Sequence, residues 1–199
     1  MKILLATNNK HKIAEMKSIL ASAFGEIVEV LLPSDILTEP LEVEETGITL
    51  EENAYLKAIA LFAATGIPSI ADDTGLEIEE LGNLPGVNSA RYAGGHGNDS
   101  LNRTKVLSEL SGSSNRKAQF RTVICFHDGV RTLFAEGICS GEILEDERGT
   151  GGFGYDSIFK PTGNVLSFAE MSASEKNLIS HRGRALQELG WLFEGYGNE

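Results

Sequence analysis

The sequence predicts an α/β protein in which helices flank a mixed β-sheet. Residues 2–6 form a short apolar strand that leads through a polar loop into a helix, as at the start of an α/β layer. Residues 69–71 form a second apolar run, and two aspartates follow it directly. Residues 117–142 contain two β-rich runs on either side of Asp128-Gly129, a strong hairpin signal. We therefore expect a mixed sheet, with the hairpin in a second lobe and a ligand cleft between the lobes.

The composition fits one compact domain. The chain has 199 residues, of which 41 % are hydrophobic, and it shows no repeat or low-complexity linker. We therefore expect residues 1–199 to form a single domain with two lobes. The formal net charge of −12 would repel a nucleic-acid backbone, so no nucleic-acid partner is expected. A small anionic substrate is compatible with this charge, because it needs only a local basic pocket and a divalent cation.

The cysteines and the apolar runs indicate a cytoplasmic protein. Cys125 and Cys139 are too few for a disulfide framework, and a tight turn at Asp128-Gly129 would place them out of register with each other. We expect both to be buried thiols in a reducing cytosol. The apolar run within residues 1–6 is too short for a signal peptide, and no stretch approaches the roughly 20 apolar residues of a membrane span.

Apolar spacing and end signals predict the remaining elements. Helical spacing starts after the polar loop, at Ile13. Further helices are expected at 50–65, ending at Gly66; from Asn98 or Asp99 to about 110; and from a capping box at 172–175 to about 194, with a possible break at Gly183. Further strands are expected at 27–32 and 157–160, and irregular segments at 33–49, 82–97 and 149–154.

The polar loop at residues 7–12 is a candidate anion site. It lies where a strand ends and a helix begins, and backbone N–H groups at the positive end of a helix favour an anion. Lys10 and Lys12 oppose the helix dipole unless an anion is bound. The alternative is a solvated loop with an asparagine cap.

The aspartate pair is a candidate metal site. Asp72 and Asp73 follow the strand at its carboxyl end, where open α/β sheets place ligands. Because strand side chains alternate, one aspartate should face the cleft and the other should face away. Carboxylate oxygens suit Mg²⁺ held against phosphates. The alternative is an aspartate turn in which Gly75 adopts a left-handed conformation.

The acidic segment before the second helix offers a further carboxylate. Among its glutamates, Glu44 is our candidate for reaching the metal, although charge runs are usually solvated. Lys57 lies on the helix that follows. Its alternative interpretation is an exposed helix lysine.

Two segments near the C-terminus are candidates for binding a planar base. Glycines around Phe153 allow a ring to approach and stack, and Asp156 could accept hydrogen bonds from ring N–H groups. The alternative is a tight turn whose aromatic residues belong to the core. His181 and Arg182, in the first turn of a new helix, could donate to the 6-oxo group of a purine and reject a 6-amino group. The alternative is an unbroken helix with a basic outer face.

Together these segments resemble the inosine/xanthosine triphosphate pyrophosphatase family, also called the non-standard purine NTP pyrophosphatases. The resemblance covers nearly the whole chain, and six motifs occur in the family's order. They are LATNNK at 5–10, ETG at 45–47 with ENA at 52–54, ADDTGL at 71–76, PGV at 85–87 with SARY at 89–92, GFGYD at 152–156 and SHRG at 180–183. The residues alone predict a phosphate-binding α/β enzyme with a carboxylate-held metal, and the choice of purine comes from the resemblance.

The resemblance implies an elongated, two-lobed α/β fold with a central cleft, a homodimer, and Mg²⁺-dependent hydrolysis of ITP, dITP or XTP to the monophosphate and pyrophosphate. It implies that Asp73 binds Mg²⁺ and accepts the proton of the attacking water, with Glu44 as the second carboxylate beside the metal. The substrate-binding set that it implies is Thr7, Asn8, Asn9, Lys10, His11 and Lys12 in the first loop, Lys57, Thr74, and around the base Phe153, Gly154, Tyr155, Asp156, Lys176, His181 and Arg182.

Two features depart from the family pattern. The first loop often carries a glycine after its threonine and another before its lysine, where this chain has Asn8 and Asn9. The family usually has proline where this chain has Ser157. We consider two alternatives to this function. One is a Maf-type pyrophosphatase of other modified nucleotides, against which the His181-Arg182 segment argues; the other is a non-catalytic nucleotide sensor.

Overall fold

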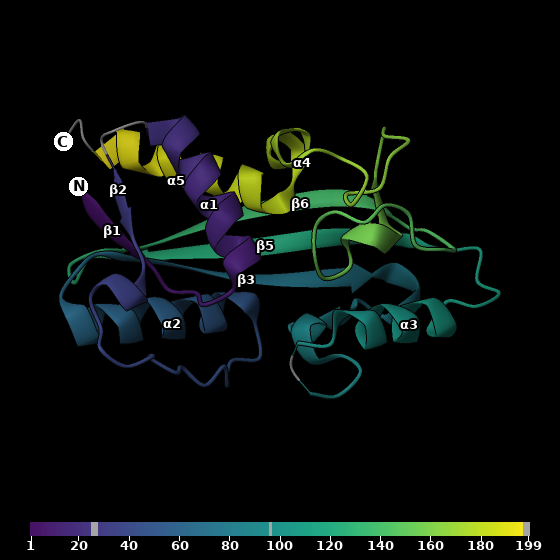
Figure 1. Ribbon diagram of the computed structural model, residues 1–199, viewed down its shortest axis with the longest axis horizontal. Coiled ribbons are helices and arrows are strands. Elements are labelled where there is room, and N and C mark those ends of the chain that lie inside the picture. Colours follow the sequence, from purple (N-terminus) through teal and green to yellow (C-terminus); the bar gives the residue numbers. More distant parts are fainter. Residues whose placement is uncertain (25–27, 96, 197–199) are drawn as a thin grey trace. The chain divides into compact units, whose positions relative to one another are not determined.

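Figure 1 shows the computed structural model of the chain, which describes residues 1–24, 28–95 and 97–196. Within these residues seven strands form one sheet in the order β2-β1-β3-β5-β6-β7, with β4 paired to β3. The strands are β1 (Lys2–Leu5), β2 (Glu29–Leu31), β3 (Ser69–Ile78), β4 (Leu84–Gly86), β5 (Lys117–His127), β6 (Thr132–Ile143) and β7 (Phe159–Pro161). β1 pairs in parallel with β2 and β3, whereas the β3–β4 and β6–β7 pairs are antiparallel. The predicted mixed sheet is confirmed; Ile27, the expected start of the second strand, lies outside the described residues.

Helices accompany this sheet, as the predicted α/β class requires. They are α1 (Lys10–Phe24), α2 (Leu50–Thr65), α3 (Asp99–Glu109), α4 (Ala173–Ile179) and α5 (His181–Tyr196). Short 3₁₀ turns lie at Pro33–Asp35, Glu79–Leu81, Ser89–Arg91 and Asp156–Ile158. No helix in the described part of the chain is long and apolar enough to cross a membrane.

Local end signals set the helix boundaries. Thr49 and Glu52 form a capping box at the start of α2, and Gly66 ends this helix in the left-handed conformation with φ of 67°. Asn98, rather than Asp99, caps α3 by accepting a hydrogen bond from the N–H of Leu101. The expected break at Gly183 was wrong, because the chain leaves the helix earlier. Ser180 has an extended conformation between α4 and α5 and donates its N–H to the carbonyl of Lys176.

The described residues cluster into two compact units, each with its own hydrophobic core. The first unit takes the described parts of Met1–Asp73, Thr122–Gly137 and Arg182–Glu199, and the second takes those of Thr74–Arg121 and Ile138–His181. The first core packs α1 and α5 against β1, β3, β5 and β6, and in this unit α2 lies on the other face of the sheet (Figure 1). The second core joins α3 to β3, β5, β6 and β7 and contains Tyr155 and Phe168. The tip of the hairpin belongs to the first unit and its open end to the second.

β3 is longer than predicted, because Gly75 continues the strand. The alternative interpretation, an aspartate turn at Gly75, is wrong: β3 runs to Ile78, and Leu76 pairs with Gly86 of β4. A Cβ atom at Gly75 would lie 2.8 Å from the carbonyl oxygen of Gly86, so glycine is needed here for the close approach of β4. The two aspartates therefore lie inside a strand rather than at its carboxyl end. The parallel pairing of β3 with β1 ends at Ile70, just before the two aspartates.

The hairpin turn is wider than the two-residue turn that Asp128-Gly129 predicts. The carboxylate of Asp128 accepts hydrogen bonds from the N–H groups of Val130 (3.0 Å) and Arg131 (2.7 Å), so β6 begins at Thr132. Cys125 and Cys139 are buried, and neither forms a disulfide bond within the described residues, as predicted.

Candidate functional site

The loop between β1 and α1 ends in an asparagine cap. The side-chain oxygen of Asn9 accepts hydrogen bonds from the N–H groups of His11 (2.9 Å) and Lys12 (3.2 Å), and the Thr7 hydroxyl accepts one from the N–H of Asn9 (3.2 Å). The asparagine cap is therefore present. It places Lys10, His11 and Lys12 in the first turn of α1, where the helix dipole disfavours cations and favours an anion. The cap and an anion site are compatible.

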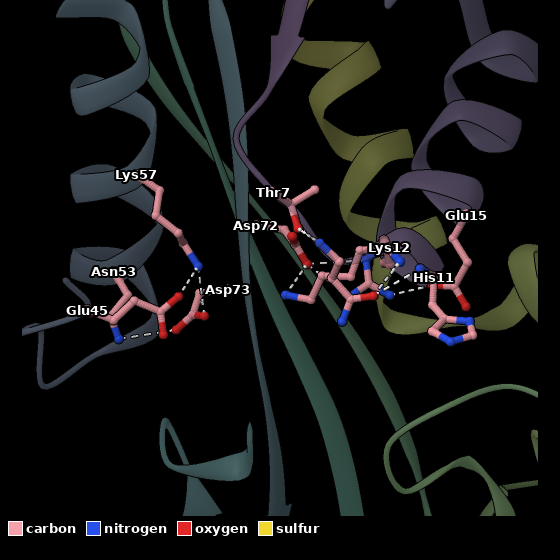
Figure 2. Close-up of polar contacts among 11 residues, drawn as sticks. Thr7, His11, Lys12, Glu15, Glu45, Asn53, Lys57, Asp72 and Asp73 are labelled. Atoms are coloured by element: carbon pink, nitrogen blue, oxygen red, sulfur yellow. Dashed lines mark hydrogen bonds and ion pairs between the residues drawn. The ribbon is translucent and has the colours of Figure 1, made fainter. Parts of the chain in front are cut away.

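Asp72 and Asp73 project from opposite sides of β3, as strand alternation predicts. Figure 2 shows Asp72 with Lys12 on the α1 side and Asp73 with Lys57 on the α2 side. We expected only one aspartate to face ligand-binding groups. Instead, each of the two carboxylates faces a lysine, so polar clusters lie on both sides of the strand.

The first cluster is a buried network around Asp72. The carboxylate contacts Lys12 Nζ (3.1 Å) and, on Arg182, Nη2 (2.9 Å) and Nε (3.2 Å). Arg182 also donates through Nη1 to Glu15. Asp72 and Arg182 are each only 1 % exposed, so these charges depend on one another.

Burial and charge oppose each other in this network. Burial acts to raise the pKa of Asp72, but Lys12, Arg182 and Lys57 outweigh it and hold the pKa well below its usual range. Burial lowers the pKa of Lys12, although Asp72 acts in the opposite direction. Asp72 is therefore an ionised counter-ion for cations, rather than a group that takes up a proton.

The structure places Arg182 in this network and His181 elsewhere. Both lie in the first turn of α5, as predicted, so the alternative of an unbroken helix is wrong. Adjacent helix residues point about 100° apart. Arg182 contacts Asp72 and Glu15 in the first unit, whereas the His181 ring packs in the second unit. Glu15 was not predicted as a site residue; its position three residues after Lys12, on the same face of α1, was the available signal.

The second cluster surrounds Asp73 on the α2 side of β3 (Figure 2). Lys57 Nζ lies 3.1 Å from Asp73 Oδ1 and 2.7 Å from Glu45 Oε1, and Asn53 Nδ2 donates to Asp73 Oδ2 at 3.3 Å. Burial raises the pKa of Asp73, against the opposing effect of Lys57. For Lys57 burial acts to lower the pKa, but Asp73, Asp72 and Glu45 outweigh it and raise the pKa. The interpretation of Lys57 as an exposed lysine is wrong, since its side chain is 12 % exposed.

The acidic segment brings Glu45, rather than Glu44, to this cluster. The side-chain oxygen of Asn53 on α2 accepts a hydrogen bond from the N–H of Gly47 at 2.8 Å. This bond holds the acidic segment against the helix. A Cβ atom at Gly47 would lie 2.6 Å from the same side-chain oxygen of Asn53, so only glycine fits this contact. With the segment held in this way, Glu45 reaches Lys57, and the side chain of Glu44 is exposed.

The Phe153 loop forms a cation–aromatic cluster in the second unit. Asp156 Oδ2 accepts the N–H of Phe153 (2.9 Å) and an N–H of the Lys176 ammonium (2.6 Å). Lys176 Nζ lies 4.9 Å from the centre of the half-buried Phe153 ring. A Cβ atom at Gly152 would lie 2.1 Å from Asp156 Oδ2, which explains the glycine beside the aromatic residue.

His181 and Tyr155 are buried in the same unit. The His181 ring stacks on Phe120, with centres 4.5 Å apart and planes 19° apart, and it lies 6.1 Å from Phe168. Lys176 Nζ is 5.4 Å from the centre of the Phe168 ring, so Phe168, which was not predicted as a site residue, lies near both Lys176 and His181. Tyr155 fits the core interpretation, because it is 5 % exposed and donates its hydroxyl to the carbonyl of Ser89.

The expected residues thus gather in two groups, one in each unit. The first contains Thr7, Lys12, Lys57, Asp73 and Arg182, with the exposed Asn8 and Asn9 in the loop after β1 and the exposed Lys10 and His11 in the first turn of α1. The second contains Phe153, Gly154, Tyr155, Asp156, Lys176 and His181. Thr74 follows Asp73 on β3 and is half-buried. The cleft between the lobes stays a prediction.

Comparison with known proteins identifies the family. The Ham1 family matches residues 3–191 of the chain. The chain belongs to the Ham1 family. One relative, the dITP/XTP pyrophosphatase of Christiangramia forsetii, is 48 % identical over 190 residues, which span 95 % of this chain and 97 % of the relative. The dITP/XTP pyrophosphatase of Aquifex aeolicus is 47 % identical over 198 residues and 95 % of each chain.

Solved Ham1 structures share the fold. The Staphylococcus aureus Ham1 protein superposes with a TM-score of 0.86 at 38 % identity, over 98 % of this chain and 100 % of that chain. A HAM1 protein from Coxiella burnetii gives a TM-score of 0.86 at 38 % identity, over 98 % of this chain and 99 % of that chain. The sequence resemblance and its α/β fold class are therefore confirmed.

Asp72→Asn should destabilise the protein, because it leaves Lys12 and Arg182 buried with less negative charge around them. Breaking a buried ion pair typically costs about 3 kcal/mol or more. We expect a loss of this size in the free energy of unfolding, measured by urea denaturation at neutral pH. Glu29→Gln is the matched control, since its ion pair with Lys2 is exposed and should contribute under about 1 kcal/mol. Equal losses in both variants would show that the Asp72 network does not stabilise the fold.

Proposed function

We propose that this Ham1 chain hydrolyses the non-standard purine nucleoside triphosphates ITP, dITP and XTP to the monophosphate and pyrophosphate. The observation that carries the proposal is the buried Asp73 carboxylate, held between Lys57 and Asn53 with a raised pKa. Relatives named dITP/XTP pyrophosphatase, 48 % and 47 % identical over 95 % of the chain, support it independently. Lys57 and Asp73 are residues of the kinds that an anhydride hydrolase needs, namely a cation that can bind phosphate and a carboxylate that can act as a base.

The triphosphate binds at the start of α1. Lys10 and Lys12 supply charge, and Thr7, Asn8 and Asn9 supply hydroxyl and amide groups beside the positive end of the helix. His11 lies in the same turn, and Lys57 adds a further ammonium group. Asp72, with its low pKa, keeps Lys12 paired at 3.1 Å in the absence of substrate.

Asp73 and Glu45 are the proposed ligands for Mg²⁺. The described residues contain no cluster of three His, Cys, Asp or Glu side chains able to hold a metal ion. Mg²⁺ does not need one, because it is commonly held by one or two carboxylates together with substrate phosphates and water. The carboxylates of Asp73 and Glu45 both contact one cation, the Lys57 ammonium, so their arrangement fits a shared Mg²⁺ ion. When bound, the metal would neutralise phosphate charge. Glu45 thus replaces Glu44 in our proposal.

Asp73 is the proposed proton acceptor. A water oxygen bonds to the α-phosphorus, the bond to the bridging oxygen breaks, and pyrophosphate leaves with the bonding electrons. The proton of the water passes to Asp73, whose raised pKa makes it a stronger base than an exposed aspartate. Lys57, 3.1 Å away, keeps this carboxylate oriented and ionised before the reaction.

The base binds among the residues of the second unit. Phe153 offers a half-buried ring for stacking, and Lys176 and His181 are the donors that distinguish a 6-oxo from a 6-amino purine. Asp156 holds Lys176, and it also fixes the Phe153 backbone. Arg182 is occupied by Asp72 and Glu15, so we assign it to the phosphate side through Asp72.

A homodimer and a cytoplasmic location are further proposals. The homodimer rests on the resemblance, and the cytoplasmic location rests on the two buried thiols, Cys125 and Cys139. The non-catalytic sensor and the Maf-type enzyme are the alternative functions. Neither has a specific structural observation in its favour.

The first test is substrate selectivity. Pyrophosphate release with Mg²⁺ should be rapid for ITP, dITP and XTP. It should be at least about 100-fold slower for ATP, because the 6-amino group of adenine would face N–H donors that are placed for a 6-oxo group. ATP and GTP are the comparison substrates, and omission of Mg²⁺ is the control. Equal rates for ATP and ITP would contradict the assignment of Lys176 and His181. Tight binding without turnover would support the sensor.

Asp73→Asn tests the base. The variant should lower kcat by about 10²–10⁴, the usual contribution of a general base, while ITP still binds with an affinity near that of the wild type. Single-turnover rates and calorimetric titration measure the two quantities. Glu39→Gln, which removes an exposed carboxylate from the acidic segment, is the control. Substantial activity in Asp73→Asn would remove Asp73 from this role.

Glu45→Gln and Glu44→Gln form a matched pair for the second carboxylate. Glu45 converges with Asp73 on Lys57, whereas Glu44 is exposed. Loss of a metal-site carboxylate should raise the Mg²⁺ concentration for half-maximal activity by about tenfold or more in Glu45→Gln. Glu44→Gln should leave it near the wild-type value. The reverse result would return the role to Glu44.

A further inference from the structure

Helix α3 holds both backbone polar groups of Gly154. The N–H of Gly154 donates to Asp99 Oδ2 at 2.8 Å, and its carbonyl oxygen accepts from Arg103 Nη1 at 2.8 Å. Asp99 and Arg103 are four residues apart, so they occupy one face of the helix, one turn from each other. All three residues belong to the second unit.

This contact fixes the backbone on either side of Gly154. Its N–H belongs to the peptide group shared with Phe153, and its carbonyl belongs to the one shared with Tyr155. Gly154 has a φ of 61°, a conformation that offers no regular helical or strand pairing for these groups. The two side chains of α3 therefore set the course of the backbone next to the Phe153 ring.

Arg103 is itself held in place. Its Nε lies 3.0 Å from Glu147 Oε2, and the Ser157 hydroxyl donates to the same oxygen at 2.8 Å. The Arg103 side chain is only 19 % exposed. Glu147 thus links Arg103 of α3 to Ser157, which follows the Phe153 loop. Ser157 is the position where the family pattern has proline. Asp99 is available for its contact because Asn98 caps the helix.

We propose that Asp99 and Arg103 are positioning residues that set the Phe153 ring for stacking on the purine base. The inference rests on the proposed function. A stacking residue contributes only when its ring is correctly placed, and a shift of about 1 Å in a binding group can cost up to about 100-fold in rate. Neither residue touches the substrate in this proposal; each acts through the peptide groups of Gly154.

The test separates base binding from phosphate binding. Arg103→Met removes the donor but keeps the apolar stem. The affinity for IMP, measured by calorimetry, should fall about tenfold or more, and KM for ITP should rise more than kcat falls. Inhibition by inorganic tripolyphosphate, which has no base, should be unchanged. Arg103→Lys should recover part of the loss, because its ammonium group can still donate to the carbonyl of Gly154.

A second pair of variants, at Asp99, distinguishes a local effect on base binding from a folding defect. Asp99→Ala should reproduce the loss of IMP affinity, whereas Asp99→Asn keeps an acceptor oxygen for the N–H of Gly154 and should bind IMP nearly as the wild type does. Lys105→Met is the matched control on the same helix, since Lys105 donates to the carbonyl of Tyr92 instead.

Three outcomes would overturn the inference. They are unchanged IMP affinity in Arg103→Met and Asp99→Ala, an equal loss of IMP and tripolyphosphate binding, and an equal loss in Lys105→Met. Failure of the proposed function is recognised separately, because the wild type would then bind IMP without hydrolysing ITP.

Discussion

The chemistry of this chain depends on one constraint, the alternation of side chains along β3. Two adjacent carboxylates cannot point the same way on an extended strand, so Asp72 and Asp73 face α1 and α2 respectively. Asp72 gathers Lys12 and Arg182 and stays ionised, while Asp73 is buried beside Lys57 with a raised pKa. One strand therefore provides a counter-ion on one side and a candidate base on the other. β3 continues beyond both residues to Ile78, and Gly75 leaves room there for Gly86 of β4.

Charge balance explains how an acidic chain can serve an anionic substrate. The net charge of −12 describes the chain as a whole, whereas Lys12 and Lys57, two of the proposed phosphate ligands, are held in place by the buried carboxylates of Asp72 and Asp73. Lys12 lies against Asp72 and Lys57 against Asp73 and Glu45, so each lysine is held in a defined position, as the proposed phosphate site requires. Ordering long side chains in advance reduces the entropy lost on binding.

Much of the fold could be predicted from the sequence, because its signals are local. Helix α2 lies at residues 50–65 as predicted, since Thr49 and Gly66 mark its ends within the segment itself. The opposite faces of the aspartate pair follow from strand periodicity alone. Contacts between distant segments could not be predicted in this way. The role of Gly75 depends on Gly86, and Arg182 binds Glu15 near the other end of the chain as well as Asp72. Helix spacing places Glu15 on the Lys12 face of α1, but it does not predict Arg182 as a partner. The contact of Glu45, rather than Glu44, with Lys57 depends on Asn53 holding Gly47. Each was decided by packing, which spacing along the sequence does not encode.

The two buried thiols have a practical consequence for spectroscopy. Burial raises the pKa of Cys125 to about 12, so almost none of the reactive thiolate exists near neutral pH, and Cys139 is only 2 % exposed. Maleimide dyes should therefore spare both native cysteines in the folded protein. A single cysteine introduced at a solvent-facing position, such as Ser108, would then carry a fluorophore on α3 without prior removal of the natural thiols.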